Sequence, residues 1–505
     1  MSDRWPGSDG FTSDKAPTII EYVPGADLLV GYEVSANPNA IVCAKLALDT
    51  RQDFPEWVSR ADLTARLDAV GKSAEDAVRD YFTRLRKTAI EELTKRGFYK
   101  QDAPAEIRWV MTIPAVWSDA ARQKTLDAAK AAGIGPKIQT ISEPEAAAVH
   151  TFATLQNKDL KIGDVYIVCD AGGGTVDLIT LEVTRLDPMQ FREVVPGEGG
   201  LCGSAFINFG FENLMKTKFG PNEFHKFRKR SPKQLKVVMD NFDQSIKRSF
   251  DMSKARNRRR KFELPFPGMP DNSTIGIDGG MLSLTSEEIE NMFEPVCRDV
   301  LLLIQRQFDA ATRAGHAPSG ILVVGGLGRS PYLLDRINER FIGTLTTAGI
   351  KRDYDQMTED RALRPANRTM TLLKSADAWT AVVRGAALGG MADVELVTSR
   401  KARRNYGVRT NTPWDPSKHS PWAKYWDNAE AKWKARGLLR IYKLCSINIP
   451  CAKIPRQAFQ KMENSEGNTY TYLKYDLGMH VGSGELRFDF RIDGKVLGHI
   501  DARFD

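Results

Sequence analysis

The sequence predicts an α/β fold over most of its length and a separate β-rich domain at its end. Short apolar runs typical of buried strands alternate with stretches whose apolar residues recur at helical spacing, the longest of them over 63–97. From about residue 395 the pattern changes to alternating apolar and polar residues between turn signals, which is typical of antiparallel sheets. At 505 residues the chain is too long for one core, so we expect roughly two to four domains.

The most informative stretch is a glycine-rich turn between two strand-like runs, 165–169 and 176–183. Two such runs joined by a few residues predict a hairpin. Its three glycines permit positive φ and let backbone N–H groups approach a ligand. Acidic residues beside this turn suit a magnesium-bound phosphate, because Mg²⁺ prefers hard oxygen ligands. An ordinary surface hairpin is the alternative. The residues concerned are Asp170, Gly172, Gly173, Gly174, Thr175 and Asp177.

Before this hairpin the sequence predicts strands and helices in succession. Residues 1–16 are polar and rich in Gly, Ser and Asp, so we expect them to be disordered. The apolar run 42–48 contains Lys45. Ser142 and Glu145 have the spacing of a capping box, which predicts a helix start. The other expected elements are strands at 18–22, 28–33, 107–113 and 138–141 and helices at 63–97 and 120–132.

After the hairpin, a second glycine-rich turn at Gly203 and Ser204 opens a helix expected over 205–219. Gly325 and Gly326 follow a buried-type strand and precede a helix that starts after Ser330. This arrangement suits the phosphates or ribose of a nucleotide. The other expected elements are a basic helical stretch over 232–250, strands near 275–284, and helices over 285–314 and 379–389.

Composition places the chain among soluble intracellular proteins. The net charge of +8 is spread along the chain, so we expect neither a nucleic-acid nor a membrane partner. The densest basic run, 254–261, is interpreted as a solvated loop, with a localisation signal as the alternative. The six cysteines form no regular framework, and no apolar run is long enough to cross a membrane. We therefore expect a cytoplasmic protein, with a nuclear location as the alternative.

Four segments stand in an order that resembles the heat shock protein 70 family of the actin-like ATPase superfamily: 141–147, 170–177, 203–204 and 324–331. The divergent fungal-type members are the most similar. The resemblance covers roughly 17–395 and implies a two-lobed, ribonuclease H-like ATPase domain. Its first lobe would span 17–164 and its second lobe 165–394, with a β-rich C-terminal domain over 395–505.

The resemblance also implies ATP or ADP with Mg²⁺ as ligands and assigns roles to single residues. Asp170 and Asp177 match carboxylates near the Mg²⁺ and the attacking water, and Glu143 matches a glutamate that faces the metal. Lys45 falls near the position of the catalytic lysine. The residues that match nucleotide contacts are Gly172, Gly173, Gly174, Thr175 and Gly203 for the phosphates, Lys247 and Arg248 beside the adenine, and Gly325, Gly326 and Arg329 in the adenosine motif.

The family's first hairpin, of the type Asp-x-Gly-Thr-Thr, has no match in this sequence. Residues 8–13 have similar letters in the wrong order, and 18–22 resembles the segment that comes after that hairpin in the family. The resemblance therefore implies that the chain begins after the family's first two strands, unless Met1 is a mis-assigned start. We then expect the strand at 107–113 to have an unpaired edge, or residues 1–16 to fill the gap.

Three functions are compatible with this pattern. The first is an ATP-binding, heat shock protein 70-like protein, and a chaperone-type ATPase if it turns ATP over. The second is a catalytically inactive nucleotide sensor or scaffold, because phosphoryl transfer depends on the positioning and charge neutralisation that the first hairpin provides. In both, the β-rich domain is a candidate for binding protein clients or a partner. The third, a sugar or acid kinase of the same superfamily, would also need the missing hairpin.

Overall fold

The structure is a computed structural model, in which the chain forms two compact units, Met1–Lys401 and Ala402–Asp505. The division falls shortly after the boundary expected at 394–395. In the first unit the structure describes residues 5–342 and 370–401, except 11, 36, 38, 51–53, 55–59, 101–106, 136–137, 155–159, 253–260, 268, 376 and 393–395. In the second it describes 411–417, 421, 424–427, 431–436, 445–446, 454–481, 486–492, 494–500 and 503–504.

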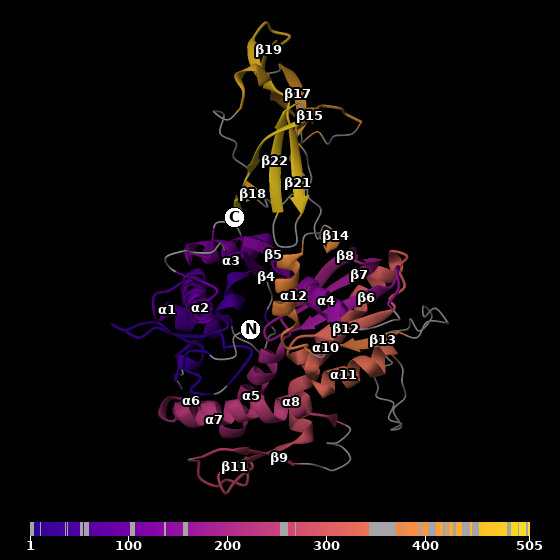
Figure 1. Cartoon of the computed structure of the whole chain (residues 1–505). Coiled ribbons are helices and arrows are strands. Elements are labelled where there is room, and N and C mark those ends of the chain that lie inside the picture. The colour runs from indigo at the N-terminus through magenta and orange to yellow at the C-terminus, as the bar shows by residue number, and fades with distance from the viewer. Residues whose placement is uncertain are drawn as a thin grey trace. The chain divides into compact units, whose positions relative to one another are not determined.

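A six-stranded mixed sheet forms the centre of the predicted second lobe and extends past its expected end at residue 394 to β14 (Figure 1). Its strand order is β13-β12-β6-β7-β8-β14. Strands β6, β7 and β8 are antiparallel neighbours, whereas β12 runs parallel to β6, which confirms the predicted hairpin. The strands are β6 Val165–Ala171, β7 Val176–Leu186, β8 Met189–Gly200, β12 Gly320–Val324, β13 Thr371–Lys374 and β14 Val397–Ser399.

Helices cover both faces of this sheet, which explains why β6 is apolar along most of its length. Ile167 and Cys169 belong to the core that the sheet forms with α5 and α10. Tyr166 and Val168 point the other way and pack with α4 and α12, since alternate residues of a strand face opposite sides. These helices are α4 Glu143–Thr154, α5 Ser204–Phe219, α10 Ser286–Arg313 and α12 Ala381–Met391.

Helices α4 and α12 cross in close contact and join the two lobes (Figure 1). Helix α4 follows directly on β5 (Ile138–Ser142) of the first lobe, and α12 belongs to the second. At the crossing, a β-carbon built on Gly385 would lie 1.7 Å from the carbonyl oxygen of Ala146. Only glycine allows the two backbones to approach this closely.

The rest of the second lobe lies below the sheet in Figure 1. The basic helical stretch predicted over 232–250 is present as a helix with a single π-helical turn, η3. The capping box predicted at Thr285 and Glu288 begins α10. The elements of this region are α6 Pro221–Arg230, α7 Pro232–Asn241, η3 Phe242–Ile246, α8 Lys247–Ser249, β9 Lys261–Pro265, β10 Ile277–Asp278, β11 Met281–Thr285 and α11 Pro331–Ile337.

The described part of the predicted first lobe contains two separate small sheets. Strand β1 pairs with β2 and β3 on its two sides, and β4 pairs in parallel with β5. No strand in the described part of the chain pairs with the other edge of β4, which agrees with the expected unpaired edge. The strands are β1 Ile19–Glu21, β2 Leu29–Val30, β3 Ile41–Val42 and β4 Trp109–Ile113.

The single helix predicted over 63–97 is wrong, because the structure has two. They are α1 (Arg60–Asp68) and α2 (Ala74–Lys95), separated by a turn in which Gly71 has a φ of +64°. Ser73 then caps α2, and its hydroxyl oxygen accepts a hydrogen bond from the Asp76 amide at 3.0 Å. The predicted helix at 120–132 is present as α3 (Asp119–Ala131).

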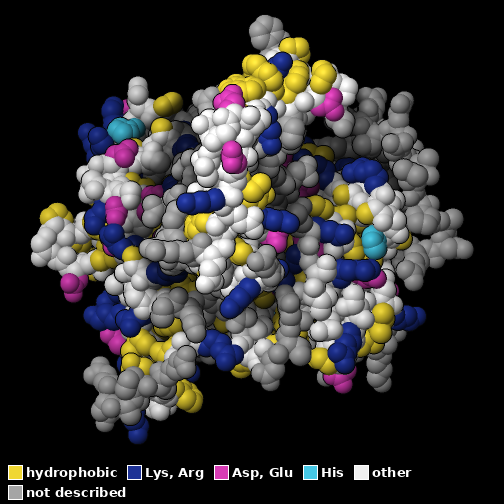
Figure 2. Space-filling view, turned by 90° about the horizontal axis from the view of Figure 1, so that it is seen from above, with side chains coloured by type: hydrophobic (Ala, Val, Ile, Leu, Met, Phe, Trp, Pro, Cys, Tyr) yellow, Lys and Arg dark blue, Asp and Glu magenta, His cyan; other side chains and the backbone are white. Residues whose placement is uncertain are grey.

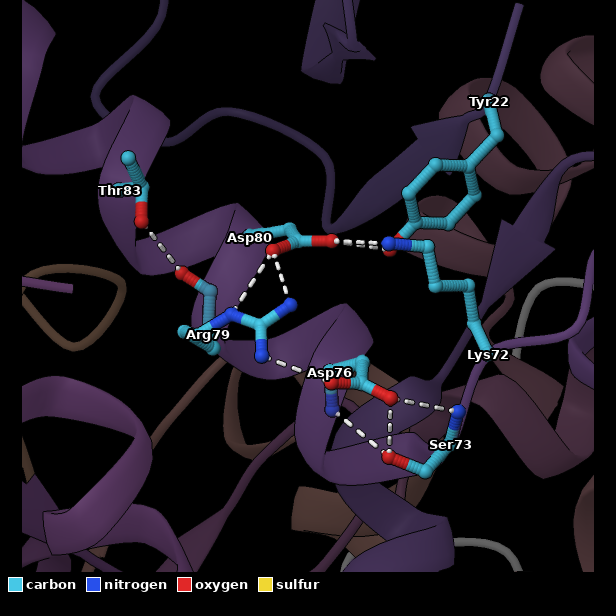
Figure 3. A network of polar contacts seen from close by, with 7 residues as sticks. All are labelled: Tyr22, Lys72, Ser73, Asp76, Arg79, Asp80 and Thr83. Atoms are coloured by element: carbon cyan, nitrogen blue, oxygen red, sulfur yellow. Dashed lines mark hydrogen bonds and ion pairs between the residues drawn. The ribbon is translucent and has the colours of Figure 1, made fainter. Parts of the chain in front are cut away.

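A polar network fastens the β1 sheet to α2 (Figure 3). The carboxylate of Asp80 on α2 accepts a hydrogen bond from the Tyr22 hydroxyl at 2.9 Å, and Tyr22 follows β1 directly. The same carboxylate pairs with the Lys72 amine at 3.3 Å and with Arg79 at 2.8 Å. This network fixes the chain just after the N-terminal segment.

The described residues of the N-terminal segment make defined contacts, although we expected disorder for 1–16. The indole nitrogen of Trp5 donates a hydrogen bond to the Ser13 carbonyl oxygen at 2.8 Å. A β-carbon on Gly7 would lie 2.6 Å from the Glu33 amide nitrogen. The Tyr32 hydroxyl donates to the Lys15 carbonyl oxygen at 3.1 Å. Residues 5–10 and 12–16 therefore pack on the protein as irregular chain.

The described part of the second unit forms two three-stranded antiparallel sheets, β15-β17-β16 and β21-β22-β23, and two antiparallel strand pairs, β18-β24 and β19-β20. Strands β20, β22, β23 and β24 lie within the predicted runs at 468–475, 484–492 and 495–504, and the run at 438–444 lies outside the described residues. The strands are β15 Asn411–Pro413, β16 Lys424–Asp427, β17 Lys432–Arg436, β18 Cys445–Ser446, β19 Phe459–Glu463, β20 Thr469–Leu473, β21 Asp476–Val481, β22 Leu486–Ile492, β23 Lys495–Ile500 and β24 Arg503–Phe504.

Basic side chains are scattered over the face shown in Figure 2 and do not gather into one patch. The basic run 254–261 lies outside the described residues, apart from Lys261 in β9. Among the helices that the structure describes, none has the length and apolarity needed to span a bilayer.

Candidate functional site

The β6–β7 hairpin holds two carboxylates side by side. Asp170 is the last but one residue of β6, and it lies directly opposite Asp177 of β7. Both side chains are buried, with exposed fractions of 5% and 1%. One oxygen of Asp177, Oδ1, accepts a hydrogen bond from the Val116 amide of the first lobe at 2.9 Å. The hairpin therefore meets the first lobe at its acidic end.

The turn of the hairpin packs against the N-terminus of α5. The amides of Ser204 and Ala205 donate hydrogen bonds to the carbonyl oxygens of Gly172 and Gly173, at 3.1 and 2.8 Å. A β-carbon on Gly203 would lie 2.4 Å from the Gly173 oxygen, so Gly203 must be glycine. The glycines of the turn have no positive φ, contrary to what we expected. Gly173 is exposed, and a β-carbon there would meet no atom within 4 Å.

Two first-lobe residues complete the site, and we call the set Asp170, Asp177, Glu143 and Lys45 the carboxylate cluster. Glu143 is the first residue of α4, placed by the Ser142–Glu145 contact that caps this helix at 3.4 Å. The amine of Lys45 donates to Glu143 Oε1 at 2.7 Å. Lys45 lies in the 3-10 helix η2 (Ala44–Leu48), which starts after Cys43 with a φ of +56°. A non-glycine residue in this region is strained, by about 1–2 kcal/mol.

The crowding of these carboxylates changes their proton affinity. Burial, followed by repulsion from Glu143 and Asp177, raises the pKa of Asp170 to about 8. Burial and Glu143 also raise the pKa of Asp177 to about 6, while hydrogen bonds from Thr175 and Val116 oppose the shift. Where burial and mutual repulsion disfavour ionised carboxylates, a nearby cation stabilises them strongly. The electrostatics of the site therefore favour a bound cation.

The carboxylate cluster fits a hydrated Mg²⁺ better than a directly coordinated metal. The second oxygen of Asp177, Oδ2, is buried and has no hydrogen-bond partner among the described residues. Glu143 is occupied by Lys45, and the described residues contain no set of three His, Cys, Asp or Glu placed to hold a metal ion. Mg²⁺ usually keeps several waters and binds through one or two carboxylates. Asp170 and Asp177 are the residues that would hold it, through water.

The glycine turn after β12 lies next to the hairpin. Gly325 has a φ of +84°, and its amide donates to the Ala378 carbonyl oxygen at 3.0 Å. A β-carbon on Gly325 would lie 2.5 Å from Asp170 Oδ1, and one on Gly326 would lie 2.6 Å from the Trp379 ring. Both glycines are therefore required by packing within the protein. Trp379 lies over the turn where we expected a nucleotide to contact the backbone.

The basic residues assigned to the adenine differ in their surroundings. The amine of Lys247 is engaged by the Asp243 carboxylate, by Asn208 Oδ1 at 2.9 Å and by the Ser204 carbonyl oxygen at 3.4 Å. Burial lowers the pKa of Lys247, and Asp243 opposes this shift. Arg248 lies with its guanidinium 5.8 Å from the centre of the Trp379 ring. Arg329 ends the 3-10 helix η4 (Leu327–Arg329) and is exposed.

Sequence reasoning missed two residues of the site, Lys15 and Trp379. The amine of Lys15 lies 4.5 Å from the centre of the Trp379 ring and within electrostatic range of Asp170 and Glu143. Lys15 is an isolated lysine in a polar segment, and its position depends on contacts between distant parts of the chain. Trp379 lies just before α12, and an aromatic residue there is no signal of binding by itself.

A scan against protein-family models matches residues 100–354 to the family described as Hsp70 protein. The match covers half of the chain and includes the hairpin, Glu143 and the Gly325–Gly326 turn. The chain belongs to the heat shock protein 70 family. The predicted actin-like, two-lobed domain is consistent with this membership and with the mixed sheet. Proteins of this family generally bind ATP or ADP together with Mg²⁺.

Individual relatives support this assignment. The chain is 24% identical to "Heat shock 70 kDa protein 12A" of Homo sapiens over 506 aligned residues, which cover 83% of this chain and 69% of the relative. It is 22% identical to "Heat shock 70 kDa protein 12B" of Homo sapiens, with the same two coverages. It is 30% identical to "Chaperone protein DnaK" of Stenotrophomonas maltophilia (strain R551-3) over 271 residues, which cover 51% of this chain and 39% of that protein.

Proposed function

We propose that this Hsp70-family chain binds ATP or ADP between its two lobes, with the phosphates at the β6–β7 turn. The observation that carries the proposal is the carboxylate cluster, to which the two lobes each contribute. Lys45 and Glu143 come from η2 and α4, while Asp170 and Asp177 come from the hairpin. The exposed Gly173 backbone lies at the end of this hairpin, where a phosphate can approach without meeting a side chain.

Within this proposal each group has a task that its chemistry permits. Mg²⁺, when bound, supplies positive charge between the carboxylates and the phosphate oxygens. Asp170 and Asp177 would orient its waters, and Lys45 would stabilise charge on the phosphates. Thr175, buried beside the turn, donates a hydrogen bond to Asp177, and Gly203 lets the turn pack closely against α5. Arg248 and Arg329 would flank the base, because planar guanidinium groups stack on aromatic rings.

We propose nucleotide binding with little turnover in preference to efficient hydrolysis. Lys45 is held by Glu143 at 2.7 Å, so its charge is partly neutralised by the protein itself. A second amine, that of Lys15, lies in the field of the same carboxylates. Phosphoryl transfer is sensitive to the placement of every charge around it. This arrangement favours the nucleotide-sensing function over a chaperone-type ATPase.

Calorimetry with ATP and a separate turnover assay test the proposal. We expect heat of binding at a single site per chain and phosphate release near background. No binding of ATP or ADP at any protein concentration would refute nucleotide binding. Mg²⁺-dependent hydrolysis that is lost in Asp170→Ala would show instead that the protein is a working ATPase.

Replacing Arg329 with alanine should weaken the binding of ATP more than the binding of inorganic triphosphate. Arg329 is exposed beside the glycine turn, and a guanidinium stacked on a base contributes about 1 kcal/mol or more, so we expect the affinity for ATP to fall by roughly 5-fold or more. Affinities for both ligands would be measured by calorimetry. The control is Arg313→Ala, at the exposed end of α10, which should change neither the affinity for ATP nor that for inorganic triphosphate. An equal loss for both ligands would place Arg329 on the phosphates.

We propose that the second unit holds a protein client or partner. Trp426 and Trp433 form an edge-to-face pair with ring centres 5.3 Å apart, and both rings are exposed, at 40% and 47%. Exposed aromatic side chains are enriched at protein interfaces. Binding of unfolded polypeptides by the wild type and by Trp433→Ala tests this role. If the full chain captures no unfolded polypeptide, the client role is wrong.

A further inference from the structure

The N-terminal segment brings a second lysine into the candidate nucleotide site. The Lys15 amine lies over the Trp379 ring, 4.5 Å from its centre. Trp379 in turn touches the Gly325–Gly326 turn, and Gly325 lies directly against Asp170. Lys15 is thus connected to the carboxylate cluster through a short chain of contacts. Burial lowers the pKa of Lys15, and the nearby carboxylates of Asp170 and Glu143 oppose this shift.

The backbone around Lys15 is fixed on both sides, so its position does not depend on the side chain alone. The Lys15 carbonyl oxygen accepts hydrogen bonds from the Ser13 hydroxyl at 2.9 Å and from the Tyr32 hydroxyl at 3.1 Å. The indole of Trp5 holds the Ser13 carbonyl oxygen at 2.8 Å. Shortly afterwards the chain enters β1, where Ile20 is buried. The segment delivers Lys15 to the site as a preorganised group.

The charges of the site explain what this lysine does. Asp170, Asp177 and Glu143 carry three negative charges when ionised, and the Lys45 amine is committed to Glu143. Burial and repulsion raise the pKa of Asp170 to about 8 and that of Asp177 to about 6, so their charged forms beside an incoming polyphosphate need a nearby cation. Proteins of the family generally bind ATP or ADP together with Mg²⁺, a cation that can play this part. Here an ammonium group of the chain lies in electrostatic range of Asp170 before any ligand arrives.

We propose that Lys15 acts as a tethered cation that neutralises the carboxylate cluster and binds the nucleotide phosphates, so that ATP or ADP binds here without a divalent metal. This inference rests on the proposed nucleotide binding and names its ionic requirement. An ammonium group has three donors and suits phosphate oxygens as a point charge. Because it is attached to the chain, it loses less freedom on binding than a free ion does. Trp379 supports the amine through a cation–π contact.

Calorimetric titration of the full chain with ATP, in EDTA and in Mg²⁺, tests the inference. For the wild type we expect affinities in the two buffers to agree within about 3-fold. For Lys15→Ala we expect the affinity for ATP in EDTA to fall by roughly 10-fold or more, because one charge-assisted contact contributes about 1.4 kcal/mol. In Mg²⁺ the affinity of this variant should recover. Lys15→Arg keeps the charge and should bind ATP in EDTA. Lys95→Ala, an exposed lysine at the end of α2, is the matched control and should behave as wild type.

A second readout uses no nucleotide. Without Lys15 the carboxylates have lost a counter-ion, so Lys15→Ala should bind Mn²⁺ more tightly than the wild type in direct titration. Thermal unfolding would show whether the variant is folded, and we expect that it is, because Lys15 is exposed. Three results would overturn the inference. The first is that ATP binding by the wild type disappears in EDTA. The others are that Lys15→Ala binds ATP in EDTA as tightly as the wild type does, or more tightly. Absence of ATP binding by the wild type in both buffers refutes the proposed function itself, and the inference with it.

Discussion

Replacing Gly385 with alanine is expected to destabilise the first unit by roughly 3 kcal/mol or more. The new methyl group would lie 1.7 Å from the carbonyl oxygen of Ala146, well inside van der Waals contact. Backbone atoms cannot turn aside as a side chain can, so α4 and α12 would have to move apart. These helices join the lobes, so the displacement would also disturb Glu143 at the start of α4. Thermal and denaturant unfolding measure the loss.

Gly210→Ala is the matched control for this prediction. Gly210 lies within α5, and its added β-carbon would meet Met292 at 3.4 Å, an ordinary contact. Alanine favours a helix over glycine by about 1 kcal/mol, so Gly210→Ala should be neutral or stabilising. Equal stabilities for Gly385→Ala and the wild type would show that the two helices do not cross as closely as the structure has them.

Replacing Gly173 with valine is expected to lower ATP affinity by roughly 100-fold, about 2.7 kcal/mol, while the protein stays folded. A β-carbon at Gly173 meets no protein atom within 4 Å, so the fold can accept it. The branched side chain would instead occupy the space proposed for a phosphate at the hairpin turn. Calorimetry measures the affinity, and the unfolding temperature confirms that the variant is intact.

Gly210→Ala again provides a control, because it changes a glycine away from the hairpin turn and should not alter ATP affinity. An unchanged affinity in folded Gly173→Val would mean that the turn has only a structural role. The hydrogen bonds from Ser204 and Ala205 to the turn would then be sufficient to explain its glycines.

Local patterns predicted those parts of the site that short segments of sequence determine. The hairpin followed from two apolar runs around a glycine turn, and it brings Asp170 opposite Asp177 as expected. The start of α4 followed from capping-box spacing, and this places Glu143. Strand β12 and the turn after it were also predicted from a buried-type run followed by two glycines. Glycine suits this turn because Gly325 has a positive φ.

Contacts between distant segments could not be predicted in the same way. The partner of Gly326 is Trp379, and the partner of Gly385 is Ala146, each far away in sequence. The place of Lys15 depends on Tyr32 and Trp379 in the same manner. One error was avoidable, because the Ser73–Asp76 capping box marks the start of α2. The spacing of Asp243 and Lys247 also predicts the ion pair that these two residues form on one helix face.

Hydrogen–deuterium exchange with and without ATP tests the central claim most directly, because it reports where the nucleotide binds. Our account predicts slower exchange on ATP addition in three segments of the first unit: 171–176 at the hairpin turn, 203–205 at the start of α5, and 325–330 after β12. Residues 12–16 should slow down with them if Lys15 contacts the phosphates. Protection confined to the second unit, or no change at the hairpin turn under conditions where ATP binds, would contradict a nucleotide site between the two lobes.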